Sequence, residues 1–219
     1  MGIVTEAYVR TFFNITADSE TDRLTQLIDI VSAMFENDLG YPVEQRTVVE
    51  YHSGANDPVL FLNARNVSSI TSIYVDSSGF FGAPGTAFAS GTLLTNGVDY
   101  ALMVEEDGVS WGGMVRRLNS VWPTPQVKPS AGLNYERDQF RGNIKATFVA
   151  GYVEADIPAD LKYAACLAIG TMRRYQKAGG VVSGYSFEGF SRQFSSQDQK
   201  DVTAVQSVLA NHRKWIWNR

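Results

Sequence analysis

Residues 143–180 read NIKATFVAGYVEADIPADLKYAACLAIGTMRRYQKAGG, and this stretch decides the fold. Apolar and polar residues alternate from Ile144 to Val149, which indicates a strand with one buried face. Asp156 and Pro158 then supply the acid and the proline that favour a helix start. Apolar and small residues follow at helical spacing, at Leu161, Ala165, Ala168, Met172 and Tyr175. The stretch therefore predicts the point where a β-rich middle of the chain passes to a helical end.

Upstream, the apolar spacing predicts two more helices. Val4, Tyr8 and Phe12 recur every four residues and indicate a short helix that ends near Asn14. The second helix begins after the capping sequence 19–22 and ends at Gly40 and Pro42. Its apolar stripe consists of Leu24, Leu27, Ile28, Val31, Met34 and Phe35. The small residues Ala164, Ala165 and Ala168 favour close packing of the later helix against this one.

Between these helical regions the hydrophobic period changes to two, which is typical of strands. The pattern predicts strands at 45–51, 58–62, 69–75, 98–104, 114–118 and 144–149, with a turn at Asp107-Gly108. They indicate a small antiparallel sheet or a partly closed barrel. The predicted fold class is α+β: a helical bundle of about four helices with an inserted small antiparallel β domain and a flexible C-terminal tail. The helical parts are 1–44 and 153–219, and the β domain is 45–152.

Two long loops, 77–97 and 119–142, interrupt the predicted strands and carry aromatic residues. Loops of this length are commonly functional, and exposed aromatic side chains commonly anchor partners. The candidate contacts of these loops are Phe80, Phe81, Phe88 and Trp122. The alternative is that both loops fold back and cap the sheet.

The C-terminal segment 179–196 is rich in glycine and aromatic residues and has no apolar periodicity of its own. A last helix over 199–213 follows, with Val202, Val205 and Leu209 on one face. The chain then finishes on Trp215 and Trp217, and exposed aromatics at a terminus indicate a binding role.

Composition argues against several classes of function. The 219 residues carry a formal net charge of −4, one cysteine and two histidines, so we expect no internal disulfide and no zinc site. The N-terminus lacks the pattern of a secretory signal, and no apolar run approaches the roughly 20 residues of a membrane helix. The sequence contains neither a P-loop nor a Rossmann glycine pattern. We therefore predict no enzyme, no cofactor and no metal.

Two groups of charged residues and one cysteine nevertheless have both a functional and a structural interpretation. Glu154, Asp156 and Asp160 are either paired carboxylates for acid–base chemistry or acids that stabilise a helix start. Arg173, Arg174 and Lys177 are either contacts to DNA phosphates or a solvated basic turn that suits the helix dipole. Cys166, inside the predicted helix, is expected to be an apolar filler.

Three segments resemble the head–tail connector proteins of tailed bacteriophages, also called adaptor or head-completion proteins, most of all the gp6-like and gp8-like families. They are LTQLIDIVSAMFENDLGYPVEQRTVVEYHSG at 24–54, VLFLNARNVSSITSIYVD at 59–76 and IKATFVAGYVEADIPADLKYAACLAIGTMRRY at 144–175. The order of strand, AGY, spacer, proline and helix in the third is the most specific of these patterns.

The resemblance implies a structural virion protein without catalytic residues, assembled in the host cytoplasm. Such proteins form a ring, typically dodecameric, beneath the portal protein, and the ring extends the DNA channel and docks the tail. Expected partners are the portal protein, further copies of the chain, a tail or stopper/terminator protein, and DNA held non-specifically, with no membrane. The implied portal-binding residues are in the C-terminal segment: Tyr185, Phe187, Phe190, Phe194, Trp215 and Trp217. Arg173, Arg174 and Lys177 are the candidate contacts in the DNA channel.

Two functions of other classes stay open at this point. One is a small hydrolase that uses the acids near Asp156. The other is a ligand-binding module in which aromatic loops hold a ligand between Phe81 and Trp122.

Overall fold

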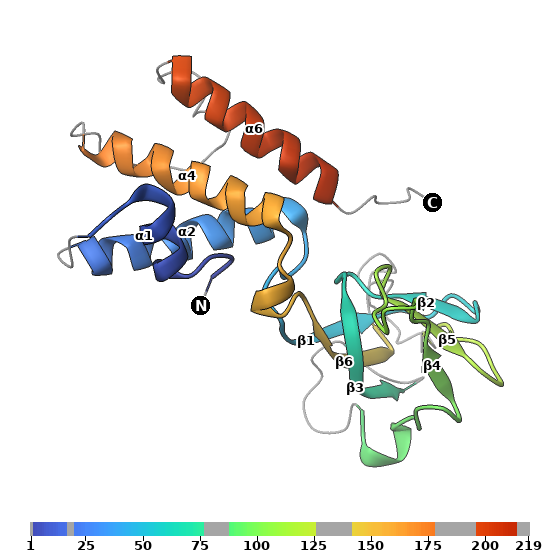
Figure 1. The fold of residues 1–219 in the computed structure, drawn as a ribbon. Helices are drawn as coiled ribbons and strands as arrows, with labels where there is room; N and C mark the ends of the chain where they lie inside the picture. The colour runs from blue at the N-terminus through green and yellow to red at the C-terminus, as the bar shows by residue number, and fades with distance from the viewer. Residues whose placement is uncertain (1, 17–19, 77–87, 126–141, 178–195, 214–219) are drawn as a thin grey trace, which may run out of the picture. The chain divides into compact units, whose positions relative to one another are not determined.

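The computed structural model describes residues 2–16, 20–76, 88–125, 142–177 and 196–213 (Figure 1). They form an α+β fold that divides into two compact units. The helical unit combines Met1–Glu44 with Tyr152–Arg219, and the β unit is Gln45–Gly151. The helices are α1 (Glu6–Phe13), α2 (Thr21–Leu39), α4 (Ala159–Lys177) and α6 (Ser196–His212), and the strands are β1 (Arg46–His52), β2 (Val59–Phe61), β3 (Val67–Val75), β4 (Tyr100–Leu102), β5 (Met114–Arg117) and β6 (Ile144–Ala150).

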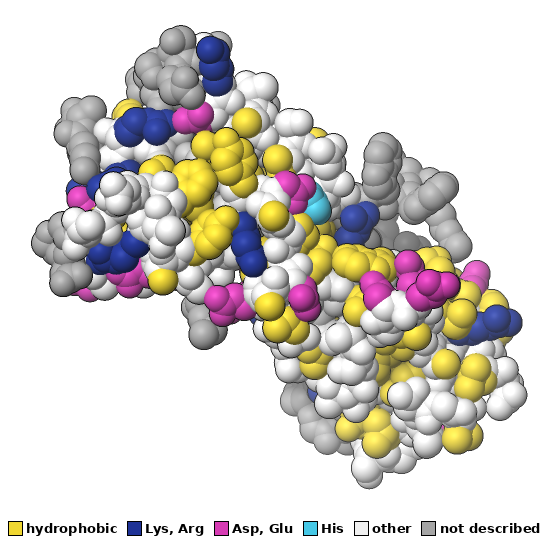
Figure 2. All heavy atoms as spheres, in the orientation of Figure 1, with side chains coloured by type: hydrophobic (Ala, Val, Ile, Leu, Met, Phe, Trp, Pro, Cys, Tyr) yellow, Lys and Arg dark blue, Asp and Glu magenta, His cyan; other side chains and the backbone are white. Residues whose placement is uncertain are grey.

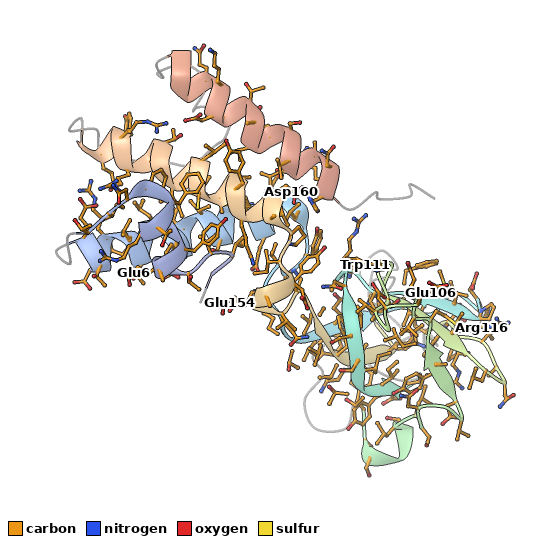
Figure 3. The ribbon with its side chains drawn as sticks, viewed as in Figure 1. Glu6, Glu106, Trp111, Arg116, Glu154 and Asp160 are labelled. Atoms are coloured by element: carbon orange, nitrogen blue, oxygen red, sulfur yellow. The ribbon has the colours of Figure 1, made fainter. Side chains whose placement is uncertain are left out.

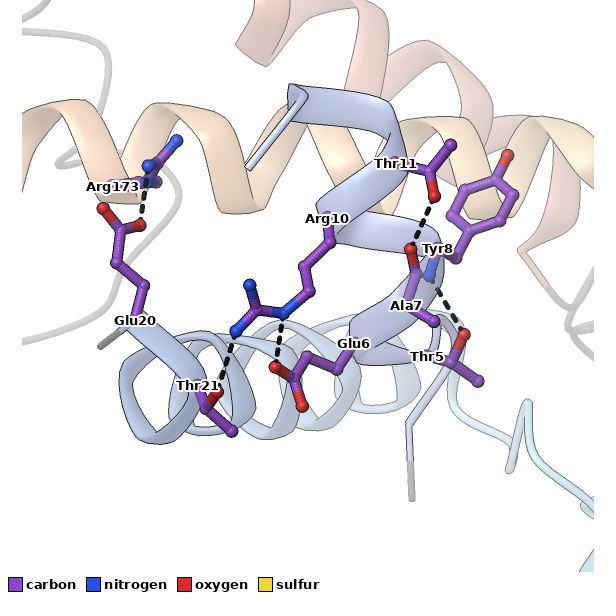
Figure 4. Close-up of polar contacts among 9 residues, drawn as sticks. All are labelled: Thr5, Glu6, Ala7, Tyr8, Arg10, Thr11, Glu20, Thr21 and Arg173. Carbon is purple, nitrogen blue, oxygen red and sulfur yellow. Dashed lines mark hydrogen bonds and ion pairs between the residues drawn. The ribbon is translucent and has the colours of Figure 1, made fainter. Parts of the chain in front are cut away.

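Polar contacts fix the start of the helical unit (Figure 4). The Thr5 hydroxyl caps α1 by accepting a hydrogen bond from the Tyr8 amide at 3.2 Å. Arg10 donates to Glu6 at 2.7 Å and to the Thr21 hydroxyl at 2.7 Å, so α1 is tied to the first turn of α2. Asn14 adopts the left-handed conformation and ends α1, at the position where the sequence predicts the end of this helix.

Helix α4 forms the centre of the helical unit, because it packs against α1, α2 and α6 (Figure 1). Ala164 and Ala165 are fully buried, as expected for a helix that approaches its neighbours closely. At Gly170 an added Cβ would lie 2.8 Å from the ring of Phe13, so a larger residue there would require that ring to shift. The other large side chains of this core include Val9, Leu24, Leu27, Val31, Phe35, Leu161, Ile169, Val205 and Leu209.

The predicted short helix is present as α1 and ends at Asn14, but two of the residues that indicated it, Tyr8 and Phe12, are not on its buried face. Val9 is fully buried and Phe13 packs against the core, whereas Tyr8 and Phe12 are 42% and 40% exposed. Helix α1 is short, with 8 residues, and the Phe13 ring at its end lies beside Gly170 of α4. This contact turns the side of α1 that carries Val9 and Phe13 toward the core. Tyr8 and Phe12 therefore belong to the surface of this unit.

The β unit contains two antiparallel three-stranded sheets, ordered β1-β6-β3 and β2-β5-β4, in place of a single sheet or barrel. Every predicted strand is present. Register shifts in β3 after Val67 and after Ile70 break its regular pairing with β6. Beside the first shift, Val67 pairs with Ser110 of the β4–β5 connection. The two sheets share one core, formed by Leu60, Leu62, Ala64, Val67, Ile73, Tyr100, Val115, Trp122, Ile144, Ala146, Phe148 and Ala150.

A buried asparagine connects three distant segments of the β unit. Asn143 is fully buried, and its side-chain oxygen accepts from the Gly54 amide at 3.0 Å while its side-chain nitrogen donates to the Pro123 carbonyl at 2.6 Å. The backbone at Gly54 approaches so closely that an added Cβ would lie 2.1 Å from the Pro123 oxygen. Asn143 therefore holds Trp122 and Pro123 against the start of β6.

Glu50 of β1 fixes the turn that follows β2. Its carboxylate accepts from His52 at 2.8 Å and from the amides of Asn63 and Ala64 at 2.8 and 3.1 Å. Burial by itself raises the pKa of Glu50, but these hydrogen bonds and the charge of His52 outweigh it and lower the pKa below its usual value of 4.5. The ionised form therefore stabilises the turn next to Phe61.

Replacing Asn143 with alanine should destabilise the β unit by about 1–3 kcal/mol, because the Gly54 amide and the Pro123 carbonyl lose a buried partner. Urea unfolding monitored by tryptophan fluorescence measures this change. Asn119→Ala is the matched control, since the Asn119 amide is exposed and makes only a 3.4 Å bond to the Val98 carbonyl. Equal stabilities of the two variants would contradict the role of Asn143.

Glu50→Gln should lower the unfolding free energy at neutral pH, and the difference from the wild type should shrink in acid. A lowered folded-state pKa contributes stability above 4.5 that is lost as the pH falls through the folded pKa. Urea unfolding between pH 7 and pH 3 measures both effects. Glu106→Gln, at an exposed carboxylate, should follow the wild-type profile. A constant gap between Glu50→Gln and the wild type would refute this account.

Candidate interaction surfaces

One face of the β2-β5-β4 sheet is apolar and exposed. Phe61 pairs with Met114, and the Met103 amide donates to the Met114 carbonyl at 2.9 Å, so the three residues form one row across the sheet. Cross-strand partners share a face and neighbours along a strand alternate. Phe61 and Met103 are 49% and 42% exposed, whereas Leu60 and Val115 on the opposite face are buried. We call this surface the outer sheet face and define it by Val59, Phe61, Ala101, Met103, Met114 and Arg116.

Acidic residues and a tryptophan flank the outer sheet face at the turn between β4 and β5. Glu105, Glu106 and Asp107 are exposed, and the Gly108 amide closes the turn on the Glu105 carbonyl at 2.9 Å. The Trp111 indole donates to Asp107 at 2.9 Å. Figure 3 places Glu106, Trp111 and Arg116 in the β4–β5 region, and Figure 2 shows acidic and hydrophobic side chains together on this unit.

The helical unit carries a second exposed apolar cluster, formed by Tyr8, Phe12 and Tyr163, which we call the helical aromatic patch. Tyr163 is 49% exposed, and its ring lies edge-on to Phe12 with 5.9 Å between centroids. Phe12 also packs edge-on against Phe13 at 5.0 Å. Figure 2 shows hydrophobic side chains gathered on the surface of the helical unit.

Of the four aromatic residues predicted as loop contacts, the structure describes two, Trp122 and Phe88, and neither is an exposed anchor. Trp122 is 1% exposed, pairs as a bridge with Asp57 and lies under the Arg117 guanidinium at 5.4 Å, so it is a core residue and not an exposed anchor. Phe88 is half-buried and packs on Tyr51 at 5.8 Å. Both therefore follow the alternative in which the loops fold back onto the strands. Phe80 and Phe81 lie outside the described residues.

The six predicted portal contacts, Tyr185, Phe187, Phe190, Phe194, Trp215 and Trp217, also lie outside the described residues. The helix that precedes the last two is held firmly. Val202, Val205 and Leu209 face the core as predicted, the Tyr41 hydroxyl donates to the His212 carbonyl at 2.9 Å, and Arg213 pairs with Asp38. The chain thus reaches residue 214 from a fixed helix end.

Two of the three predicted DNA contacts, Arg173 and Arg174, form ion pairs within the chain. Arg173 pairs with Glu20 at 2.6 Å (Figure 4), and Arg174 pairs with Asp201 at 2.6 Å. The first pair joins α4 to the start of α2, and the second joins α4 to α6. Lys177 is the last residue of α4. These ion pairs give both arginines a structural role in the bundle.

The acids near Asp156 do not converge on a catalytic arrangement. Glu154 and Asp156 are exposed on the 3-10 turn η3 (Glu154–Asp156), and Asp160 lies in the first turn of α4, 2.8 Å from His212 (Figure 3). Within the described residues no three acidic, histidine or cysteine side chains could share a metal ion.

None of the described helices is long and apolar enough to cross a bilayer. Cys166 is fully buried in the helical core, as expected for an apolar filler, and this burial raises the pKa of its thiol to about 12.

The β unit also contains a cavity of about 340 Å³ beside Arg117, whereas the predicted ligand pocket involves Phe81, which lies outside the described residues. The Nε and Nη1 atoms of Arg117 are buried and have no hydrogen-bond partner among the described residues, and the guanidinium lies over the Trp122 ring at 5.4 Å. The cavity is lined by Val75, Gly91, Thr92, Leu93, Leu94, Arg117, Ser120, Val121 and Pro123. Among these residues Arg117 is the one ionisable group, so the lining lacks an acid–base pair.

Solved structures with a similar fold come from gene transfer agent particles. A chain in the neck of an empty particle, computed with C6 symmetry, matches with a TM-score of 0.59 and 14% identity over 99% of this chain and 93% of that chain. A chain in the neck of a native particle, computed with C12 symmetry, matches with a TM-score of 0.53 and 14% identity over 90% and 86% of the two chains. A chain in the virion of a native particle matches with a TM-score of 0.55 and 13% identity over 97% and 90%. No family model and no curated protein matches this chain.

Proposed function

We propose that this protein is a structural protein of the head–tail region of a phage-like particle, and that it acts there as an adaptor. In this proposal copies of the chain form a ring between the portal protein and the tail, and the ring extends the DNA channel. The main support is the fold, which is shared with neck chains over 90–99% of this chain and 86–93% of theirs. A match of that extent includes both the helical unit and the inserted β unit.

The same comparison supports an assembly of several copies. The matching neck structures were computed with C12 and C6 symmetry, which supports a ring of copies around the particle axis. We propose a dodecamer of the gp6-like or gp8-like type. Its location is the virion, after assembly in the host cytoplasm, and its further partner is a tail or stopper/terminator protein.

The charge distribution suits a channel that DNA passes through. The chain carries a net charge of −4, and Arg173 and Arg174 are neutralised by Glu20 and Asp201. A strongly basic bore would retain DNA through its phosphates. We therefore propose non-specific passage of DNA and assign no phosphate contact to these arginines.

We assign portal binding to the aromatic residues beyond α4, above all Trp215 and Trp217. Tryptophan is enriched among the residues that dominate binding energy, and repetition around a ring adds avidity to each contact. The fixed end of α6 at His212 gives every copy the same starting point for this segment. No cofactor and no catalytic step enter the proposal.

The double variant Trp215→Ser/Trp217→Ser should bind the portal protein of the same particle at least about tenfold more weakly, because two aromatic anchors are lost. Co-sedimentation with purified portal rings measures the affinity, and electron microscopy shows whether a ring is added. The substitutions spare His212 and Arg213, whose contacts with Tyr41 and Asp38 hold α6.

Tyr8→Ser/Tyr163→Ser is the control for loss of exposed aromatic area elsewhere in the helical unit. Wild-type affinity in the tryptophan variant would overturn the assigned portal contact. A wild-type chain that neither binds portal rings nor forms rings would overturn the adaptor function itself.

A further inference from the structure

We infer that the cavity beside Arg117 is a binding site for a carboxylate that is carried on a small apolar group. The site lies within the β unit, and it brings buried hydrogen-bond donors together with a largely apolar wall. It goes beyond the proposed function and does not depend on the adaptor role.

Hydrogen-bond donors without acceptors gather at Arg117. Its Nε and Nη1 atoms are buried and have no hydrogen-bond partner among the described residues. The same holds for the indole nitrogen of Trp122, whose side chain is 1% exposed and whose ring centre lies 5.4 Å from the guanidinium carbon. Buried polar groups in folded proteins almost always have a partner, so each exception calls for an explanation. All three atoms are donors, and the partner that satisfies a donor is an acceptor.

The acidic residues next to this part of the sheet hold backbone amides instead. Asp57 pairs with Trp122 through a backbone bridge, and its carboxylate accepts from the Val59 amide at 2.8 Å. The carboxylate of Asp99 accepts from the Thr95 amide at 2.7 Å. Both carboxylates thus stabilise turns of the chain, and the acceptor for the guanidinium comes from a ligand.

The guanidinium is held in place before a ligand binds. Arg117 ends the central strand β5, and its amide donates to the Pro58 carbonyl at 2.8 Å. The Trp122 ring supports the guanidinium, and the next residue, Pro123, is fixed by its 2.6 Å hydrogen bond from Asn143. A side chain that is already ordered loses little conformational freedom on binding, so more of the contact energy is available for affinity.

The charge of the site selects a carboxylate. Arg117 is the one ionisable residue in the lining, so the site balances one negative charge. A carboxylate carries one charge and forms charge-assisted hydrogen bonds with a guanidinium. A phosphate monoester carries about −1.5 to −2 charges at neutral pH, and its excess charge would face an apolar wall.

The remainder of the wall selects the group that carries the carboxylate. Leu93, Leu94 and Val121 supply apolar surface, and Thr92 and Ser120 add two hydroxyl groups. The volume of about 340 Å³ is near the lower end of the range of ligand pockets, which is about 300–1,000 Å³. The ligand is therefore a small branched or cyclic acid, either free or as the C-terminal residue of a peptide.

The test uses two acids and their uncharged amides. Isocaproate represents the free acid and N-acetyl-leucine represents the end of a peptide, while isocaproamide and N-acetyl-leucinamide keep the shape without the charge. NMR titration of the isotope-labelled full chain follows the Arg117 Nε–H and Trp122 indole N–H signals. Arg117→Gln removes the charge from the cavity. Arg116→Gln is the matched control, because Arg116 is the exposed neighbour on the same strand and is not part of the lining.

At least one acid should bind the wild type about tenfold or more tightly than its amide, and the tighter of the two acids identifies the source of the carboxylate. Arg117→Gln should bind that acid at least about tenfold more weakly, whereas Arg116→Gln should bind it like the wild type. Urea unfolding checks both folds, and the comparison of acid with amide in the wild type decides the question if Arg117→Gln unfolds.

Four results would overturn the site: binding of neither acid, equal affinities for acid and amide, unchanged affinity in Arg117→Gln, or equal weakening in Arg116→Gln. Tighter binding of inorganic phosphate than of either acid would overturn the assignment of a carboxylate. Each of these results leaves the adaptor function standing, since that function is tested through ring formation and portal binding.

Discussion

The β unit depends on the pairing of β6 along both of its edges. Ile144, Ala146, Phe148 and Ala150 are fully buried on one face of this strand, so its backbone groups need partners within the protein. β1 and β3 supply them from positions about 70 to 100 residues earlier in the chain. The core that supports the outer sheet face therefore closes only when three distant segments have met.

The same strand passes directly into the helical unit. Gly151 adopts a positive φ of 98°, and the Tyr152 amide then donates to the Val43 carbonyl at 2.7 Å. Ile157 and Leu161 are buried in the helical core immediately afterwards. The segment between β6 and α4 thus acts as a short structural connection.

Periodicity was sufficient where a segment buries one face. The stripe of α2, the face of α6 and all six strands could be predicted from local spacing. The division into two sheets could not, because it depends on register shifts in β3 and on a pairing between Val67 and Ser110. The burial of Trp122 depends in turn on contacts of Asn143 with Gly54 and Pro123, which no local pattern encodes.

The outer sheet face was missed for a related reason. In β2 and β5 the neighbouring residues on both faces are apolar: Leu60 and Val115 point to one face, and Phe61 and Met114 point to the other. Alternation therefore does not tell which face meets solvent. One sequence signal was available. The short strands β2 and β5 carry Phe61 and Met114 on one face and Leu60 and Val115 on the other, and one small core cannot bury both apolar faces.

The β unit enters and leaves the helical unit at adjacent positions, since Glu44 and Tyr152 pair as a parallel bridge. A segment whose two ends meet can be exchanged for another of different length without moving the helices that flank it. Natural selection can therefore vary this insert while the bundle is preserved. In evolutionary terms, the meeting of the two ends at Glu44 and Tyr152 makes the β unit a replaceable module within the helical unit.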